Sequence, residues 1–134
     1  MPDELAALLF AGERFCMGFD IYGVSPINKK GEYFRNNVWW WRGIHGLIDY
    51  SCHDILTEEE FENLGWNNGY EYNEVTANQI AERLEVVAND EKLLEKYETI
   101  IMGQLGDSYE DCWSKDNILE FVEFLKNSGG FKVC

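Results

Sequence analysis

Three adjacent tryptophans, Trp39 to Trp41, are the feature that most constrains how this chain can fold. On a helix, neighbouring side chains point about 100° apart, so three consecutive indoles cannot all enter one core. At least one of them must lie against a second surface or a ligand. The surrounding stretch, residues 31–42, also holds two of the four arginines of the chain. The sequence therefore predicts a binding site here.

The segment that carries the tryptophans is predicted to form a helix that starts after Gly31. Its apolar residues follow the spacing of an amphipathic helix of about five turns. These residues are Phe34, Val38, Trp41, Ile44 or His45, Ile48, Cys52 and Ile55. We assign this stripe to the core.

Local signals mark the ends of further helices. They are a capping box at 57–60, an N-cap at Asn73 or Thr76, a break at Asn89 and Asp90, an N-cap at Ser114, and a stop at Gly129 and Gly130. The break leaves open whether residues 77–105 form one long helix or two.

A small amount of β-structure is expected at the two ends of the chain. Residues 15–24 are rich in aromatic and β-branched side chains and predict a strand, of which residues 17–22 would pair with a short edge strand at 131–134. The expected fold is mainly α, with four to five helices and a small two-stranded β element. It forms a single compact α or α+β domain over residues 1–134.

The formal charge of −14 comes entirely from the second part of the chain. Residues 1–48 carry five acidic and five basic side chains, whereas residues 49–134 carry twenty acidic and six basic ones. A surface of this sign repels nucleic acid and anionic membranes and favours a basic protein surface.

Two interpretations of the acidic residues stay open. They either solvate helix faces and keep the protein soluble, or they form an interaction surface. Glu58 with Glu62 and Glu91 with Glu95 are like-charged i, i+4 pairs, which mildly destabilise a helix and so favour the second interpretation. The predicted acidic partner face consists of Glu58, Glu59, Glu62, Glu91, Glu95 and Glu98.

A polar stripe is predicted on another face of the tryptophan helix, made of Arg35, Trp39, Arg42, Gly46, Asp49 and His53. Guanidinium groups beside an indole stack on nucleobases or hold phosphates and carboxylates. The predicted ligand-binding or partner-binding residues are Arg35, Asn36, Asn37, Trp39, Trp40, Arg42, His45, Asp49 and His53. The alternative is structural, with Arg35 and Arg42 paired with the acidic second part.

The sequence carries no catalytic or metal-binding motif. Its four cysteines form no C-x-x-C pair, and Cys52 and His53 point about 100° apart on a helix, which disfavours joint zinc ligation. Walker, G-x-G-x-x-G, H-E-x-x-H and EF-hand patterns are all missing. We therefore predict no catalytic residue, no metal and no cofactor, and an enzyme is the less favoured interpretation.

Several segments of the chain are similar in sequence to segments of other proteins. They are G-E-Y-F-R-N-N-V-W-W-W-R at 31–42, F-D-x-Y-G-x-x-P at 19–26, L-T-E at 56–58, N-G at 68–69, A-E-R-L at 81–84 and S-G-G-F at 128–131. Together they resemble a group of small phage and bacterial proteins of unassigned function, over roughly residues 17–95 and 118–134. Relatives often have a proline where this chain has Gly43, and many carry C-x-x-C pairs where it has only Cys112. The resemblance implies a phage-associated gene, not an activity.

The leading functional hypothesis is an acidic phage-type interaction or inhibitor protein of the anti-defence kind, such as an anti-CRISPR. It would bind a basic, nucleic-acid-binding surface of a host protein. The alternative is a protein that binds or sequesters a small ligand, such as a nucleotide signal, and a weaker alternative is a metal-dependent hydrolase. We expect neither nucleic acid nor a membrane as a direct partner, and the sequence leaves open whether the chain forms a homo-oligomer. The apolar run at the N-terminus is too short for a signal peptide, so we expect a cytoplasmic protein, in the host cytosol if phage-encoded.

Overall fold

Four short strands form one antiparallel sheet in the computed structural model, which describes residues 18–106 and 113–134. The strands are β1 (Gly18–Gly23), β2 (Tyr33–Asn37), β3 (Tyr70–Tyr72) and β4 (Phe131–Val133). Their order in the sheet is β2-β1-β4-β3, so β2 and β3 are the edge strands. The predicted pairing of the C-terminal strand with the first strand is confirmed, since Ile21 lies opposite Val133.

The sequence predicted two strands, and the other two were missed. β2 falls in the segment assigned to the start of the tryptophan helix, so that assignment is wrong for residues 33–37. Phe34 fits the helical spacing by coincidence, because in a strand it faces the core by alternation, between the exposed Tyr33 and Arg35. β3 has only three residues, too few for a pattern of alternation to stand out.

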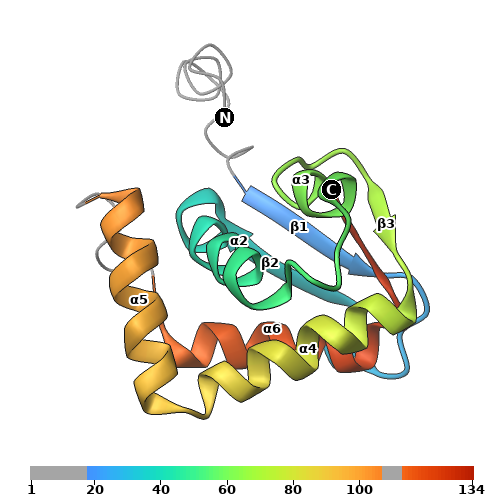
Figure 1. Ribbon diagram of the computed structural model, residues 1–134. Helices are drawn as coiled ribbons and strands as arrows, with labels where there is room; N and C mark the ends of the chain where they lie inside the picture. Colours follow the sequence, from blue (N-terminus) through green and yellow to red (C-terminus); the bar gives the residue numbers. More distant parts are fainter. Residues whose placement is uncertain (1–17, 107–112) are drawn as a thin grey trace.

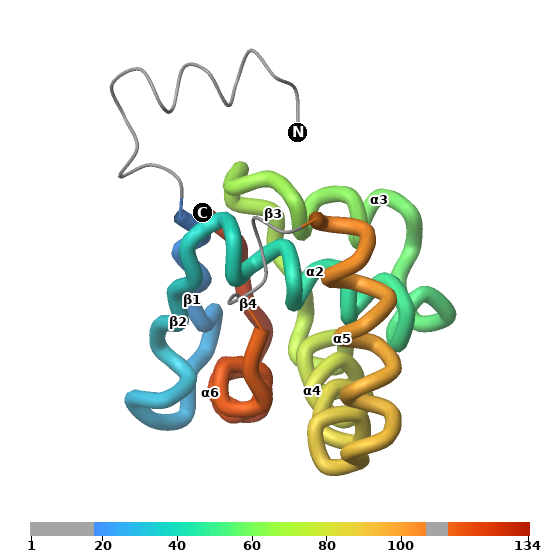
Figure 2. The backbone as a smooth tube through the Cα atoms, turned by 90° about the vertical axis from the view of Figure 1, so that its left-hand side faces the viewer, coloured from blue at the N-terminus to red at the C-terminus, as the bar shows by residue number. Residues whose placement is uncertain are grey.

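Five α-helices of the described part of the chain lie on one side of the sheet. They are α2 (Val38–Cys52), α3 (Glu58–Asn63), α4 (Glu74–Ala88), α5 (Glu91–Leu105) and α6 (Lys115–Ser128), with a short 3-10 helix η2 (Lys29–Gly31) between β1 and β2. α4 and α6 run side by side and α5 stands next to α2 (Figure 1). In Figure 2, β1 and β2 lie on one side of the molecule and α3, α4 and α5 on the other. α2 and α6 pack directly on the sheet, and α4 and α5 pack on these two helices, so the chain is a single compact α+β domain.

The helix boundaries follow the predicted signals closely. Thr57 forms a complete capping box with Glu60, and the side chains of Asn73 and Ser114 accept hydrogen bonds from backbone amides of the first turns of α4 and α6. The break at Asn89 and Asp90 separates α4 from α5, and Gly129 ends α6 in the left-handed conformation. The predicted strand residues 15–17 lie outside the described residues, as do residues 107–112.

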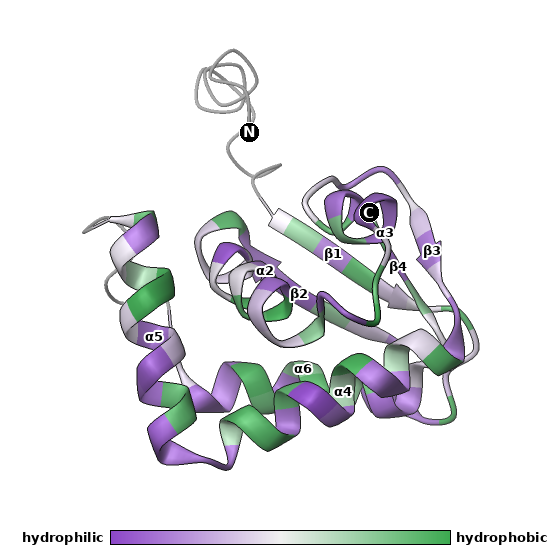
Figure 3. Ribbon diagram, in the orientation of Figure 1, coloured by the Kyte–Doolittle hydropathy of each residue, from purple (hydrophilic) through white to green (hydrophobic). Residues whose placement is uncertain are grey.

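The apolar core lies between the sheet and the helices. Trp41 is 1% exposed and donates a hydrogen bond from Nε1 to the Leu64 carbonyl at 2.7 Å, while its ring meets Phe121 edge to face at 5.3 Å. Trp39 and Trp40 are only partly buried, so the expectation that the three tryptophans cannot share one core is confirmed. Green apolar bands alternate with purple polar bands along α4, α5 and α6 (Figure 3), as amphipathic helices require.

The connection between β1 and β2 is tied to the end of α6. Backbone amides of Ser25 and Ile27 donate to the carbonyls of Ser128 and Asn127, each at 2.9 Å. A Cβ atom at Gly31 would overlap the Asn127 carbonyl, so this approach requires glycine. These contacts hold β2 alongside α6.

No helix among the described residues has the length and apolar character that crossing a membrane requires.

Candidate partner-binding surface

The structure distributes the nine predicted ligand-binding residues over three places. Arg35, Asn36 and Asn37 lie on β2, while Trp39, Trp40, Arg42, His45 and Asp49 lie on α2 and His53 is its C-cap. The predicted stripe at helical spacing is therefore wrong for Arg35, which precedes the helix. Asp49 and His53 are exposed and line none of the cavities described below. Trp39 is partly buried against the core.

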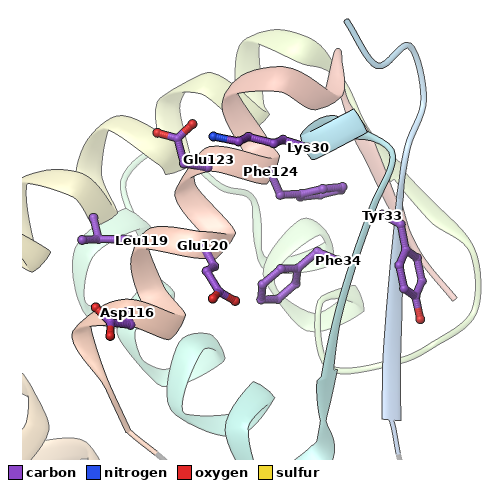
Figure 4. A pocket seen from close by; sticks show the side chains of 8 residues that line it. All are labelled: Lys30, Tyr33, Phe34, Asp116, Leu119, Glu120, Glu123 and Phe124. Carbon is purple, nitrogen blue, oxygen red and sulfur yellow. The ribbon is translucent and has the colours of Figure 1, made fainter. Parts of the chain in front are cut away.

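A groove between β2 and α6 contains four of these residues. At one end, a cavity of about 500 Å³ is lined by Lys30, Tyr33, Phe34, Asp116, Leu119, Glu120, Glu123 and Phe124 (Figure 4). At the other end, a cavity of about 450 Å³ is lined by Arg35, Asn36, Asn37, Trp40, Ser114, Asp116, Asn117 and Glu120. Asp116 and Glu120 line both cavities, so the two adjoin, and together they are called the groove; β2 and α6 run antiparallel along it.

A reciprocal pair of side-chain amides joins the two walls of this groove. Asn36 Nδ2 donates to Asn117 Oδ1 at 2.9 Å, and Asn117 Nδ2 donates to Asn36 Oδ1 at 3.0 Å. Asn36 is only 8% exposed and also donates to the Arg35 carbonyl. Asn37 accepts a hydrogen bond from the Trp40 amide and caps α2. Both asparagines therefore have structural roles that position the groove.

The groove carries unpaired negative charge. Figure 4 shows Glu120 in the space between α6 and β2, next to the Phe34 ring, with Lys30 at the Glu123 end. The three ion pairs in the described part of the chain leave out Asp116, Glu120 and Glu123. The floor is apolar, since Phe34 and Phe124 are buried. This combination suits a cation that carries an apolar stem.

The guanidinium of Arg35 is occupied on the opposite side of β2, where no described element covers the sheet. Its Nη1 atom lies 2.9 Å from Asp20 Oδ1 on β1, and the Tyr33 hydroxyl donates to the same oxygen. Burial raises the pKa of Asp20, but the hydrogen bonds from Tyr33 and Arg35 together outweigh it, so the pKa of this carboxyl is lowered. Arg35 therefore pairs with an acid of the first part of the chain, and the proposed pairing with residues 49–134 is wrong for it.

A second cavity, of about 600 Å³, lies between α2 and α3. It is lined by Phe19, Val38, Trp41, Arg42, His45, Glu58, Phe61, Glu62, Gly65 and Trp66. It thus brings Arg42 and His45 of the predicted ligand site together with Glu58 and Glu62 of the predicted acidic face. Arg42 takes part in none of the ion pairs among the described residues.

His45 forms part of the wall of this second cavity. Its Nε2 atom lies 3.1 Å from the Phe61 carbonyl oxygen, and its ring stacks on the Phe61 ring at 4.4 Å. Burial lowers the pKa of His45, although the Phe61 carbonyl and Asp49 oppose the shift. The imidazole is therefore neutral at physiological pH, and its Nε2–H donates a hydrogen bond to the carbonyl.

The predicted acidic face is divided into two patches. Glu58, Glu59 and Glu62 lie on α3, whereas Glu91, Glu95 and Glu98 lie on α5. α3 and α5 stand on either side of α2 (Figure 1). None of the six takes part in the ion pairs of the described residues, which use Asp20, Asp54 and Glu85.

Sequence reasoning missed the acidic wall of the groove. Asp116, Glu120 and Glu123 are spaced four and three residues apart on the polar side of α6, away from Ile118, Phe121, Val122 and Leu125. That spacing was visible in the sequence and places all three on one helix face. What the sequence could not show was that β2 would lie opposite them.

The described residues contain no cluster of three or more His, Cys, Asp or Glu side chains placed to hold a metal ion. Cys52 is fully buried, as its place on the apolar stripe predicted, and burial raises the pKa of its thiol.

Comparison of the chain with protein-family models, with curated proteins and with solved structures gave no match.

Proposed function

We propose that this protein acts by binding a basic surface of another protein, as an acidic inhibitor of the anti-defence type. The supporting observation is the unpaired charge of its helical layer. Residues 38–68, 73–106 and 113–128 hold sixteen acidic and six basic side chains, and only Asp54 and Glu85 among these acids form ion pairs. The remaining carboxylates lack a salt bridge within the described chain and are available to lysines and arginines of a partner.

A nucleic-acid-binding surface is the kind of basic surface that fits this charge. Such surfaces present lysines and arginines to phosphates, and an acidic protein competes for the same side chains. Complementary potentials accelerate association and weaken as salt screens them. Because the sequence resembles a group of small phage and bacterial proteins, a nucleic-acid-binding defence protein of a bacterial host is the first class of partner to test.

The test is a binding measurement between the immobilised full chain and purified nucleic-acid-binding defence proteins. We expect binding at low ionic strength, competition by nucleic acid, and at least a tenfold weaker affinity at about 0.5 M salt than at about 0.05 M. A panel in which no basic protein is retained at low salt would count against the proposal, as would a partner that still binds equally well when saturated with nucleic acid.

The α2–α3 cavity supports a second candidate, a small-ligand-binding protein. Its volume of about 600 Å³ lies in the range of ligand sites, and Trp41 and Trp66 supply aromatic walls. Arg42 would hold an anionic group, whereas Glu58 and Glu62 favour a cationic one. A tryptophan fluorescence titration with ATP and with arginine separates the two, and Arg42→Ala should abolish only the response to ATP. No response to either ligand would rule out both forms of this candidate.

A further inference from the structure

β2 is an edge strand with backbone groups that point away from the sheet. The Gly23 amide donates to the Glu32 carbonyl at 3.1 Å, so Gly23 and Glu32 are a hydrogen-bonded pair of the β1–β2 ladder. Bonded and non-bonded pairs alternate in an antiparallel ladder, so Phe34 and Asn36 bond to β1. The amides of Tyr33, Arg35 and Asn37 therefore point outward, and all three residues are exposed. A further strand can pair there.

The groove beside this edge would receive the side chains of such a strand. On α6, Asp116 and Glu120 lie four residues apart, about 6 Å along the helix axis. In an extended chain, residues i and i+2 point the same way and are about 6.7 Å apart. Two carboxylates on α6 therefore match two cationic side chains on alternate positions of an added strand.

We propose that an extended basic segment of a partner protein pairs with the outer edge of β2 and directs two alternate lysine or arginine side chains toward Asp116 and Glu120. The inference rests on the proposed function, because it specifies how a basic partner is held. Backbone hydrogen bonds would supply affinity, and the groove would supply specificity for charge.

The walls of the groove favour this occupant over a second copy of the chain. Phe34, Leu119 and Phe124 offer apolar surface for the stems of long cationic side chains. Trp40, at the far end of the groove, presents a partly exposed ring on which a guanidinium can stack. A second copy of this chain would bring a net charge of −14 to the same carboxylates and be repelled.

The first experiment measures binding of a short peptide of alternating arginine and threonine by calorimetry. The test variant is Asp116→Asn with Glu120→Gln, and the matched control is Glu91→Gln with Glu95→Gln. Both pairs are spaced i, i+4 and begin in the first turn of their helix, so both variants lose the same charge and the same favourable position at the helix N-terminus. We expect the α6 variant to weaken binding at least tenfold and the α5 variant less than threefold, on the scale of charge-assisted hydrogen bonds.

The second experiment tests the backbone pairing. Asn37 is the last residue of β2 and its φ of −71° is one that proline adopts, so Asn37→Pro removes an outward amide without disturbing the bonds to β1. Asn37→Ala is its control, because it removes the same side chain, which caps α2, and keeps the amide. We expect Asn37→Pro to bind the peptide at least tenfold more weakly than Asn37→Ala, and a backbone N-methylated peptide to lose affinity for the unmodified protein.

The outcomes separate this inference from the function it rests on. Equal losses in the α6 and α5 variants, or equal binding by Asn37→Pro and Asn37→Ala, would overturn the strand-addition site and leave a general acidic surface. Self-association of the chain that Asn37→Pro abolishes would likewise overturn it. If basic proteins bind but the peptide does not, the inference fails alone. If neither binds, the proposed function fails with it.

Discussion

The two faces of the sheet can be compared residue by residue, because neighbours along one strand point to opposite sides. On the covered face, Ile21 and Phe131 are fully buried, whereas on the open face Tyr22 and Tyr33 keep 41% and 46% of their surface exposed. The open face is held by one ion pair and a contact between two tyrosine rings at 5.2 Å. The free energy of unfolding should therefore depend mainly on the covered face. Residues on the open face and at the outer edge of β2 can then change with function at little cost in stability.

The largest contrast should come from shortening one aromatic side chain on each face. Phe131→Ala empties a fully buried position that stacks on Tyr72 at 4.6 Å, and should lower the free energy of unfolding by about 3–5 kcal/mol. Tyr22→Ala, on the open face, should cost less than about 1 kcal/mol. Denaturant unfolding of both variants measures the difference. Similar losses would show that the open face carries as much stability as the core.

The amide pair at the covered side of β2 should have the next largest effect. Asn117→Ala leaves the buried Asn36 amide without its partner, which should cost about 1–3 kcal/mol in unfolding free energy. Asn78→Ala is the control, since Asn78 is an exposed asparagine on α4 and gains the same helix propensity. The double variant Asn36→Ala with Asn117→Ala should cost less than the sum of the single changes. Additive costs would mean that the pair does not couple the two walls.

The buried imidazole of His45, on α2, should make the free energy of unfolding depend on pH. Burial lowers its pKa in the folded chain, so the unfolded chain binds the proton more readily. The free energy of unfolding should therefore decrease as the pH falls below the ordinary histidine pKa of about 6.5, and continue to decrease until the folded pKa is passed. Chemical unfolding at pH 7 and pH 5 should show this loss in the wild type and in the exposed variant His53→Gln, which keeps His45. The loss should be absent from His45→Gln, and an equal loss in that variant would contradict the assignment.

The smallest effect is expected from the ion pair of the open face. Asp20→Asn should cost less than about 1 kcal/mol at neutral pH, because both partners are partly exposed. The pKa of Asp20 is lowered in the folded chain, so its contribution is present above the ordinary carboxyl pKa of about 3.9 and is lost as the pH falls through the folded value. Unfolding curves of the variant and the wild type should therefore converge in acid. Asp49→Asn, which removes an exposed acid outside the ion pairs of the described residues, should leave stability nearly unchanged.

The parts of the fold that sequence predicted are those set by local chemistry. Thr57, Asn73 and Ser114 cap helices because their own side chains reach backbone amides three residues on, and no distant residue is needed. β2 was missed because its conformation depends on β1. Residues 33–37 also continue a helical spacing, and only pairing with residues 18–22 decides between the two.

The candidate surface was predicted less well, for the same reason. The sequence singled out Arg35 and Asn36 by residue type, but Arg35 is held by Asp20 and Asn36 by Asn117, fifteen and eighty-one residues away. The acids of α6 could have been found by their spacing, yet only the fold shows that they face an edge strand. Recognition of the groove required knowledge of which elements lie together.

The joint between Asn36 and Asn117 is built only from neutral amides. Its two hydrogen bonds involve no charged group, whereas Asp116 and Glu120, on the same groove, are acidic. A substitution that removes either acid would thus leave the spacing between strand and helix fixed. Capture of a basic segment would then need no movement of the backbone.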